Sequence, residues 1–68
     1  MKREMLVKYR GNKSQAELAK RYGVSQQVWS RWENGVCKPP VLTIKKLEND
    51  IGVPMEDIFF DIFHTKKV

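Results

Sequence analysis

The sequence contains little of what catalytic and metal-binding sites are built from. Cys37 is the single cysteine, so an internal disulfide and a cysteine-based metal site are both excluded. His64 is the single histidine and has no plausible catalytic partner. A paired-carboxylate site, a Cys/His dyad and a glycine-rich phosphate loop are missing as well. We therefore expect no enzymatic activity, and no metal, cofactor or small-molecule ligand.

Long apolar runs are also missing. No stretch approaches the roughly 20 apolar residues that cross a bilayer, and the first residues, MKREML, lack the apolar part of a secretory signal. We expect a cytoplasmic protein without membrane contact. With 68 residues the chain has room for one small domain, near the size at which core burial alone gives only marginal stability.

Positive charge is concentrated in the first part of the chain. The net charge is +5, and residues 1–40 hold nine basic and three acidic residues, whereas residues 41–68 hold four basic and five acidic ones. A positive field attracts phosphate groups and gives affinity for nucleic acid that does not depend on sequence. The first part of the chain is therefore the part expected to face a nucleic acid.

Residues 26–34 are predicted to form a helix with one polar and one apolar side. On a helical wheel at about 100° per residue the two groups do not mix. The polar side carries the amides, hydroxyl and guanidinium that pair with base edges in a DNA major groove, while the apolar side suits a core. Taken alone, an ordinary surface helix fits the pattern equally well. The polar side consists of Gln26, Gln27, Ser30, Arg31 and Asn34, and the apolar side of Val28, Trp29 and Trp32.

Another helix is predicted directly before this one, over about residues 15–22. Ser14 and Glu17 have the spacing of a capping box, which satisfies free amides at a helix start. Gly23 can adopt a positive φ and end the helix in a sharp turn, and Ser25 can cap the helix that follows. The two helices form a tight pair. Its expected buried residues are Leu18, Ala19 and Val24.

Three more helices are predicted around this pair. The first ends near Arg10, because Gly11 and Asn12 favour a turn. Another follows Pro39 and Pro40 and stops at Gly52, and Pro54 opens a short fifth helix. The expected fold is all-α, a compact bundle of about five short helices. Their apolar positions are Met5, Leu6 and Tyr9 in the first, Ile44, Leu47 and Ile51 in the fourth, and Met55, Ile58 and Phe59 in the fifth.

In its helix pair and in the residues around it, the chain resembles the helix-turn-helix family of phage repressor and Cro proteins, also called the xenobiotic-response-element (XRE) type. The resemblance spans roughly residues 4–60 and implies a lambda repressor-like DNA-binding domain. It rests on Ser14-Gln15, Leu18-Ala19, Gly23-Val24-Ser25, Gln26-Gln27, Trp29, Trp32, Glu33-Asn34-Gly35, Pro39, Leu47, Gly52-Val53 and Ile58-Phe59.

The resemblance implies roles for individual residues. The helix of residues 26–34 is expected in the major groove, where glutamine can pair with adenine and arginine with guanine. Gln15, at a helix N-terminus, is expected to anchor the unit on a phosphate. The implied base-reading residues are Gln26, Gln27, Ser30 and Arg31, and the implied phosphate contacts are Gln15, Asn34, Lys38, Lys13 and Arg10.

Two departures from the family pattern concern the core. Family members commonly carry aliphatic residues at the positions of Trp29 and Trp32, so the core is expected to be reshaped around two large rings. Family members also often pair an arginine of the first helix with the glutamate that closes the reading helix, here Glu33. Arg10 fits that role best and Lys8 is the fallback. The alternative is that Glu33 lies in solvent.

The C-terminal end is more apolar than a small core can absorb. We expect residues 1–60 to form the DNA-binding domain and residues 61–68 a C-terminal tail. Residues 59–63, FFDIF, fit either a helix or a strand. They either fold back on their own core or form a subunit contact, and we favour the contact because a palindromic operator is best matched by a homodimer. The predicted interface residues are Phe60, Ile62 and Phe63.

The predicted function is sequence-specific binding of double-stranded DNA by a transcriptional regulator, in the first place a repressor. An antitoxin of a toxin–antitoxin pair can carry the same domain and would use an apolar patch for its toxin. A protein–protein adaptor is a third possibility, although the polar side of residues 26–34 suits bases better than an apolar partner.

Overall fold

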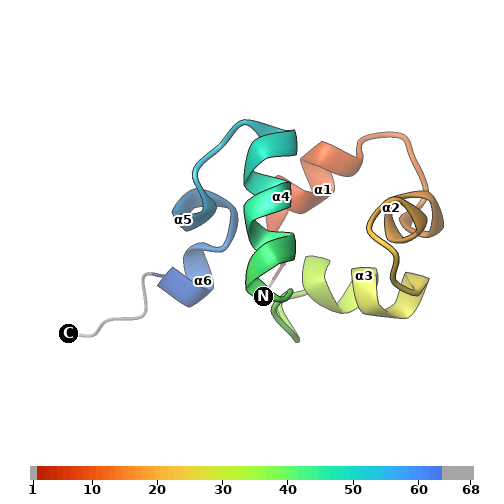
Figure 1. Cartoon of the computed structure of the whole chain (residues 1–68). Helices are drawn as coiled ribbons and strands as arrows, with labels where there is room; N and C mark the ends of the chain where they lie inside the picture. Colours follow the sequence, from red (N-terminus) through yellow and green to blue (C-terminus); the bar gives the residue numbers. More distant parts are fainter. Residues whose placement is uncertain (1, 64–68) are drawn as a thin grey trace.

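The computed structural model describes residues 2–63, without the side chains of residues 61 and 63, and shows an all-helical fold (Figure 1). The all-α prediction is confirmed. The described part contains six helices rather than about five, because Phe59 leaves the helical conformation (φ −112°, ψ 50°) and divides the last segment in two. The helices are α1 (Glu4–Arg10), α2 (Gln15–Arg21), α3 (Gln26–Glu33), α4 (Val41–Ile51), α5 (Met55–Ile58) and α6 (Phe60–Phe63).

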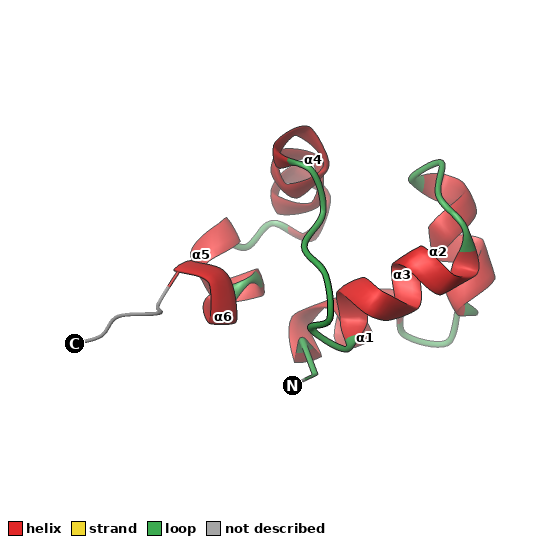
Figure 2. Cartoon of the chain, turned by 90° about the horizontal axis from the view of Figure 1, so that it is seen from below, coloured by secondary structure: helices red, strands yellow, loops and turns green. Residues whose placement is uncertain are grey.

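Helices α2 and α3 form the tight pair that local sequence signals predict. The Ser14 hydroxyl accepts from the Glu17 amide at 3.1 Å and the Glu17 carboxylate accepts from the Ser14 amide at 3.0 Å, which completes the capping box. Gly23 has φ +70°, and the Ser25 side chain accepts from the amide of Val28 at 3.2 Å. In the view from below, α3 crosses in front of α2 (Figure 2). The turn therefore fixes one helix across the other.

The core collects apolar side chains from the first five helices. Trp29, Phe59, Leu6 and Leu47 are each 0% exposed, and Ala19 is 1% exposed. Burial of a tryptophan or phenylalanine removes a large apolar area from water and dominates the stability of so small a core. The predicted core positions Val24, Met5, Tyr9, Ile51 and Met55 are partly buried against this cluster.

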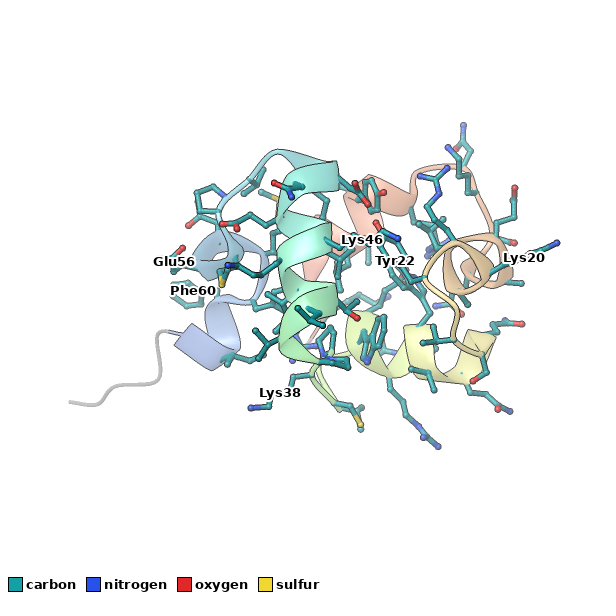
Figure 3. All side chains as sticks on the ribbon, viewed as in Figure 1. Lys20, Tyr22, Lys38, Lys46, Glu56 and Phe60 are labelled. Carbon is teal, nitrogen blue, oxygen red and sulfur yellow. The ribbon has the colours of Figure 1, made fainter. Side chains whose placement is uncertain are left out.

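Tyr22 joins α4 to the helix pair. Its ring stacks on Trp29 with centroids 5.6 Å apart, and the Lys46 ammonium lies 5.3 Å from the centroid of the same ring (Figure 3). The Tyr22 hydroxyl donates to Asp50 at 2.7 Å and shares a hydrogen bond with the Tyr9 hydroxyl at 2.8 Å. Aromatic stacking and a cation over the ring each add to the stabilisation that burial of apolar surface gives.

The apolar C-terminal segment is helical, so the strand alternative is wrong for residues 60–63. Phe59 is part of the core and Ile62 is packed against it, whereas Phe60 remains 55% exposed (Figure 3). The segment is therefore partly folded back on its own core. The Phe63 side chain and residues 64–68 of the predicted tail, including His64, lie outside the described residues.

Candidate nucleic-acid interface

Helix α3 presents a polar surface to solvent. Gln26, Gln27 and Arg31 are exposed, and Ser30 is half-buried. The exposed Asn34 follows the helix, and its amide donates to the Ser30 hydroxyl at 3.3 Å. Amide and guanidinium groups on one side of a helix can make paired hydrogen bonds to base edges in a major groove. The structure thus brings the predicted base-reading residues together on one uncovered side.

The opposite side of α3 is fixed in the core by two indoles. Trp29 and Trp32 are 0% and 3% exposed, and their rings meet edge to face with centroids 5.7 Å apart. Burial of both rings prevents the helix from rolling about its axis without breaking the core. The polar side therefore keeps one direction, as groove recognition requires.

Glu33 lies at the end of α3 and is 1% exposed. Arg10 donates to its carboxylate from Nε at 2.7 Å and from Nη2 at 3.3 Å, so the predicted pair is confirmed and the solvent alternative is wrong. Gln15 Nε2 donates at 3.0 Å and Trp29 Nε1 at 2.5 Å. One carboxylate thus ties α1, α2 and α3 together.

The pKa of Glu33 reflects two opposed effects. Burial favours the neutral acid and raises the pKa, but hydrogen bonds from Arg10, Gln15 and Trp29, with the charge of Arg10, outweigh burial and leave the pKa below its ordinary value. The carboxylate is therefore ionised at neutral pH. Its negative charge balances the guanidinium beside it.

Arg10 and Gln15 have structural partners in addition to their expected phosphate contacts. The Arg10 side chain also donates to the Lys13 carbonyl at 3.1 Å, and 24% of it remains exposed. The Gln15 side chain is half-buried, with one amide hydrogen directed at Glu33. Their contacts with phosphate stay predictions. If these contacts form, they connect the DNA backbone directly to the group that holds α3.

Arg3 was missed by the sequence reasoning. It is 4% exposed, its amide donates to the Glu33 carbonyl at 2.6 Å, and its Nη1 donates to the carbonyls of Trp32 and Cys37 at 2.8 and 2.6 Å. The guanidinium also lies 5.2 Å from the centre of the Phe59 ring. A cation at the C-terminal carbonyls of α3 is favourable because this end of a helix is negative. No local pattern in the sequence marks this role.

Two lysines flank the α2–α3 pair. Lys38 is exposed after α3 and projects at the lower edge of the molecule, the side on which α3 lies (Figure 3). Lys13 is exposed before α2 and lines a shallow hollow of about 420 Å³ with Glu17, Lys20 and Arg21. Both are accessible to phosphate, and their contacts with DNA stay predictions.

Comparison with known protein families decides the class. The family model described as helix-turn-helix matches residues 3–58, which is most of the chain. The chain belongs to the XRE-type helix-turn-helix family. This XRE-type protein is thus a DNA-binding protein of the kind that regulates transcription, and its family is not a catalytic one. No curated protein and no solved structure matches the chain.

The described part of the XRE-type protein contains neither a membrane-spanning helix nor a metal-binding cluster of side chains. Among residues 2–63, no helix has the length and apolar character needed to span a membrane. In the same part of the chain, no group of three or more His, Cys, Asp or Glu side chains is placed to hold a metal ion.

Proposed function

We propose that the protein is a sequence-specific regulator, acting as a repressor, that inserts α3 into the major groove of double-stranded DNA. The observation that carries the proposal is the division of α3 into an exposed side with Gln26, Gln27 and Arg31 and a fully buried side with Trp29. In this position Arg31 pairs with a guanine and the two glutamines with adenines, while Ser30 adds a further contact. A bound regulator of this kind blocks transcription from its site. Because DNA is its ligand, we also propose a cytoplasmic location.

The phosphate contacts position α3 without reading sequence. Two of the proposed phosphate contacts, Gln15 and Arg10, also donate to the Glu33 carboxylate. The other three, Lys13, Asn34 and Lys38, lie before and after the α2–α3 pair. We propose that two copies bind a palindromic operator as a homodimer, with residues 1–60 as the DNA-binding domain. A two-fold operator is matched by two reading helices about one DNA turn apart.

The test starts with selection of binding sites from random duplex DNA with the purified protein. Arg31→Ala should then weaken binding to the selected operator by about 1–3 kcal/mol and relax the preference at one position, expected to be a guanine. Fluorescence anisotropy on operator and on random duplex measures both effects. Lys20→Ala is the matched control, since it removes one positive charge from the outer surface of α2 (Figure 3).

The outcomes separate a reading role from a charge effect. A reading residue loses more affinity on the operator than on random DNA. Equal losses on both, or the same loss for the control variant, would contradict the role proposed for Arg31. Selection that yields no common sequence would overturn sequence-specific binding itself. Repression is tested separately by a reporter gene placed behind the selected site.

A further inference from the structure

Tyr22 connects α3 to α4 through one aromatic ring. It follows the last residue of α2 and precedes the turn at Gly23. Helix α4 lies to one side of the α2–α3 pair (Figures 1 and 2), and Tyr22 and Lys46 meet between α4 and α2 (Figure 3). The ring stacks on Trp29 of α3 at an interplanar angle of 14°, and the Lys46 ammonium of α4 lies 5.3 Å from the ring centroid. The two helices are therefore joined through the same ring.

The hydroxyl of Tyr22 holds the ring in this position. It donates to the Asp50 carboxylate of α4 at 2.7 Å and shares a hydrogen bond of 2.8 Å with the Tyr9 hydroxyl of α1. Arg21 donates to the same Tyr9 oxygen at 3.3 Å. The ring is thus fixed at its hydroxyl by two helices while it stacks on a third.

Trp29 transmits the position of the ring to the polar side of α3. The indole is 0% exposed, its Nε1 donates to Glu33 at 2.5 Å, and the next residue along the chain is Ser30 of the polar side. Helix α3 has eight residues and is about 12 Å long at 1.5 Å per residue, so a tilt of about 10° moves one end by about 2 Å. Hydrogen bonds to base edges are confined to a range of about 0.5 Å in distance. A tilt of this size would therefore break them.

Contacts with phosphate depend less on the angle of α3. A lysine such as Lys38 carries its charge on a flexible four-carbon side chain and can follow a phosphate over a small displacement. General affinity for DNA comes mainly from charge and does not depend on sequence. A change in the angle of α3 should therefore reduce the preference for one sequence and leave general affinity in place.

We propose that Tyr22 is a positioning residue for base recognition, because its ring sets the angle of α3 against α4 and so determines how strongly the protein prefers its operator. The proposal rests on the proposed function. Tyr22 acts through Trp29, which it stacks on, and not by contact with DNA. A leucine at this position could fill space, but it offers neither a flat face to the indole nor a π-system to the Lys46 cation.

The first experiment compares affinities for the selected operator and for random duplex by fluorescence anisotropy. Tyr22→Leu removes the stack, whereas Tyr22→Phe keeps the ring and loses the hydroxyl. Met55→Ala is the matched control, because it truncates a partly buried side chain on α5, at the other end of the molecule from α2 (Figure 1). We expect the ratio of the two affinities to fall at least about tenfold in Tyr22→Leu, as for the loss of one paired base contact. The ratio should stay within about twofold of the native value in Tyr22→Phe and in the control.

A role in stability alone would not change this ratio. If Tyr22→Leu loses the same factor on operator and on random duplex, or if Met55→Ala lowers the ratio as much, the positioning role is wrong. If circular dichroism shows that Tyr22→Leu does not fold, Lys46→Gln releases the ring on the α4 side, and Lys45→Gln removes the same charge from the same helix. A lower ratio for Lys46→Gln than for Lys45→Gln then supports the proposal, and equal ratios overturn it.

The second experiment measures the position of α3 in the free protein. Nitroxide labels at Gln27→Cys on α3 and Lys45→Cys on α4, in a chain with Cys37→Ser, report the distance between the two helices. Tyr22→Leu should shift or broaden the distance distribution, and Tyr22→Phe should restore it, whereas identical distributions overturn the proposal. Because no DNA is present, the two failures are distinguishable. Selection without a common sequence overturns the proposed function, and an unchanged distance overturns only the role of Tyr22.

Discussion

Replacement of Glu33 by glutamine should destabilise the protein strongly although the side chain keeps its shape. The carboxylate accepts four hydrogen bonds, two from Arg10 and one each from Gln15 and Trp29. An amide offers one oxygen and turns its NH₂ group towards donors. At least one buried donor then loses its partner, and the guanidinium loses its counter-charge.

The size of the effect follows from the exposure of each partner. Loss of one member of a buried ion pair costs about 3–5 kcal/mol, and an orphaned buried donor costs about 1–3 kcal/mol. Arg10 keeps 24% of its side chain exposed and can be hydrated in part, whereas Trp29 is 0% exposed. We therefore expect Glu33→Gln to lower the free energy of unfolding by about 2–4 kcal/mol. The total free energy of unfolding of a domain is about 0.05–0.15 kcal/mol per residue, so the variant should be close to unfolding at 25 °C.

The effect should depend on pH in a defined direction. The folded-state pKa of Glu33 lies below the ordinary value of 4.5. Stability from the ionised carboxylate is therefore fully present above about pH 4.5 and is lost as the pH falls through the folded-state pKa. The difference in free energy of unfolding between the native chain and Glu33→Gln should accordingly become smaller in acid. Protonation then removes the negative charge of Glu33 from the native chain, as the substitution does in the variant.

Urea unfolding at pH 7 and at pH 3, followed by circular dichroism and indole fluorescence, measures both effects. Glu56→Gln is the control, because this glutamate is exposed on α5 (Figure 3). A free energy of unfolding of Glu33→Gln within about 0.5 kcal/mol of the native chain at pH 7, the range of ordinary surface substitutions, would contradict the role given to this carboxylate. A difference between the two chains as large at pH 3 as at pH 7 would contradict it as well.

Three further predictions concern the core, the tyrosine and the DNA contact. Leu47→Ala should cost about 2–5 kcal/mol in thermal unfolding, because Leu47 is 0% exposed and its loss leaves a cavity. Burial and hydrogen bonds raise the pKa of Tyr22 above its usual 10.0, so stability should fall as the pH rises through 10 and beyond, and Tyr22→Phe should lack this fall in an alkaline unfolding series. Lys38→Ala should weaken binding to all duplexes alike and reduce the slope of affinity against salt by about one, so an unchanged slope would place Lys38 away from DNA.

The features that sequence predicts best are those set by neighbouring residues. The capping box at Ser14, the turn at Gly23 and the cap at Ser25 depend on side chains within three or four residues, and all three are present. The burial of Trp29 and Trp32 follows from helical periodicity in the same way. The fold class could therefore be predicted from the residues, and the Arg10–Glu33 pair only with the help of the family resemblance.

The C-terminal segment shows where periodicity fails. Four apolar residues in five fit both a helix and a strand, and the pattern does not say which of them the core has room for. The structure places Phe59 and Ile62 on the core and leaves Phe60 exposed, a division that depends on the backbone change at Phe59. Contacts with helices far away along the chain decide which of these side chains is buried, and the periodicity of five residues does not contain that information.

Arg3 and Glu33 hold the end of α3 with opposite charges, and only Glu33 could be predicted. Glu33 faces donors on α1 and α2, whereas Arg3 faces carbonyls of α3 and of the segment after it. A lysine or arginine ordinarily lies in solvent, and the contacts that bury Arg3 are with residues about 30 positions away along the chain. The same contact fixes the backbone beneath Val36. One guanidinium therefore holds the end of α3 and the segment after it in a single arrangement, in addition to the buried indoles that fix the other side of the helix.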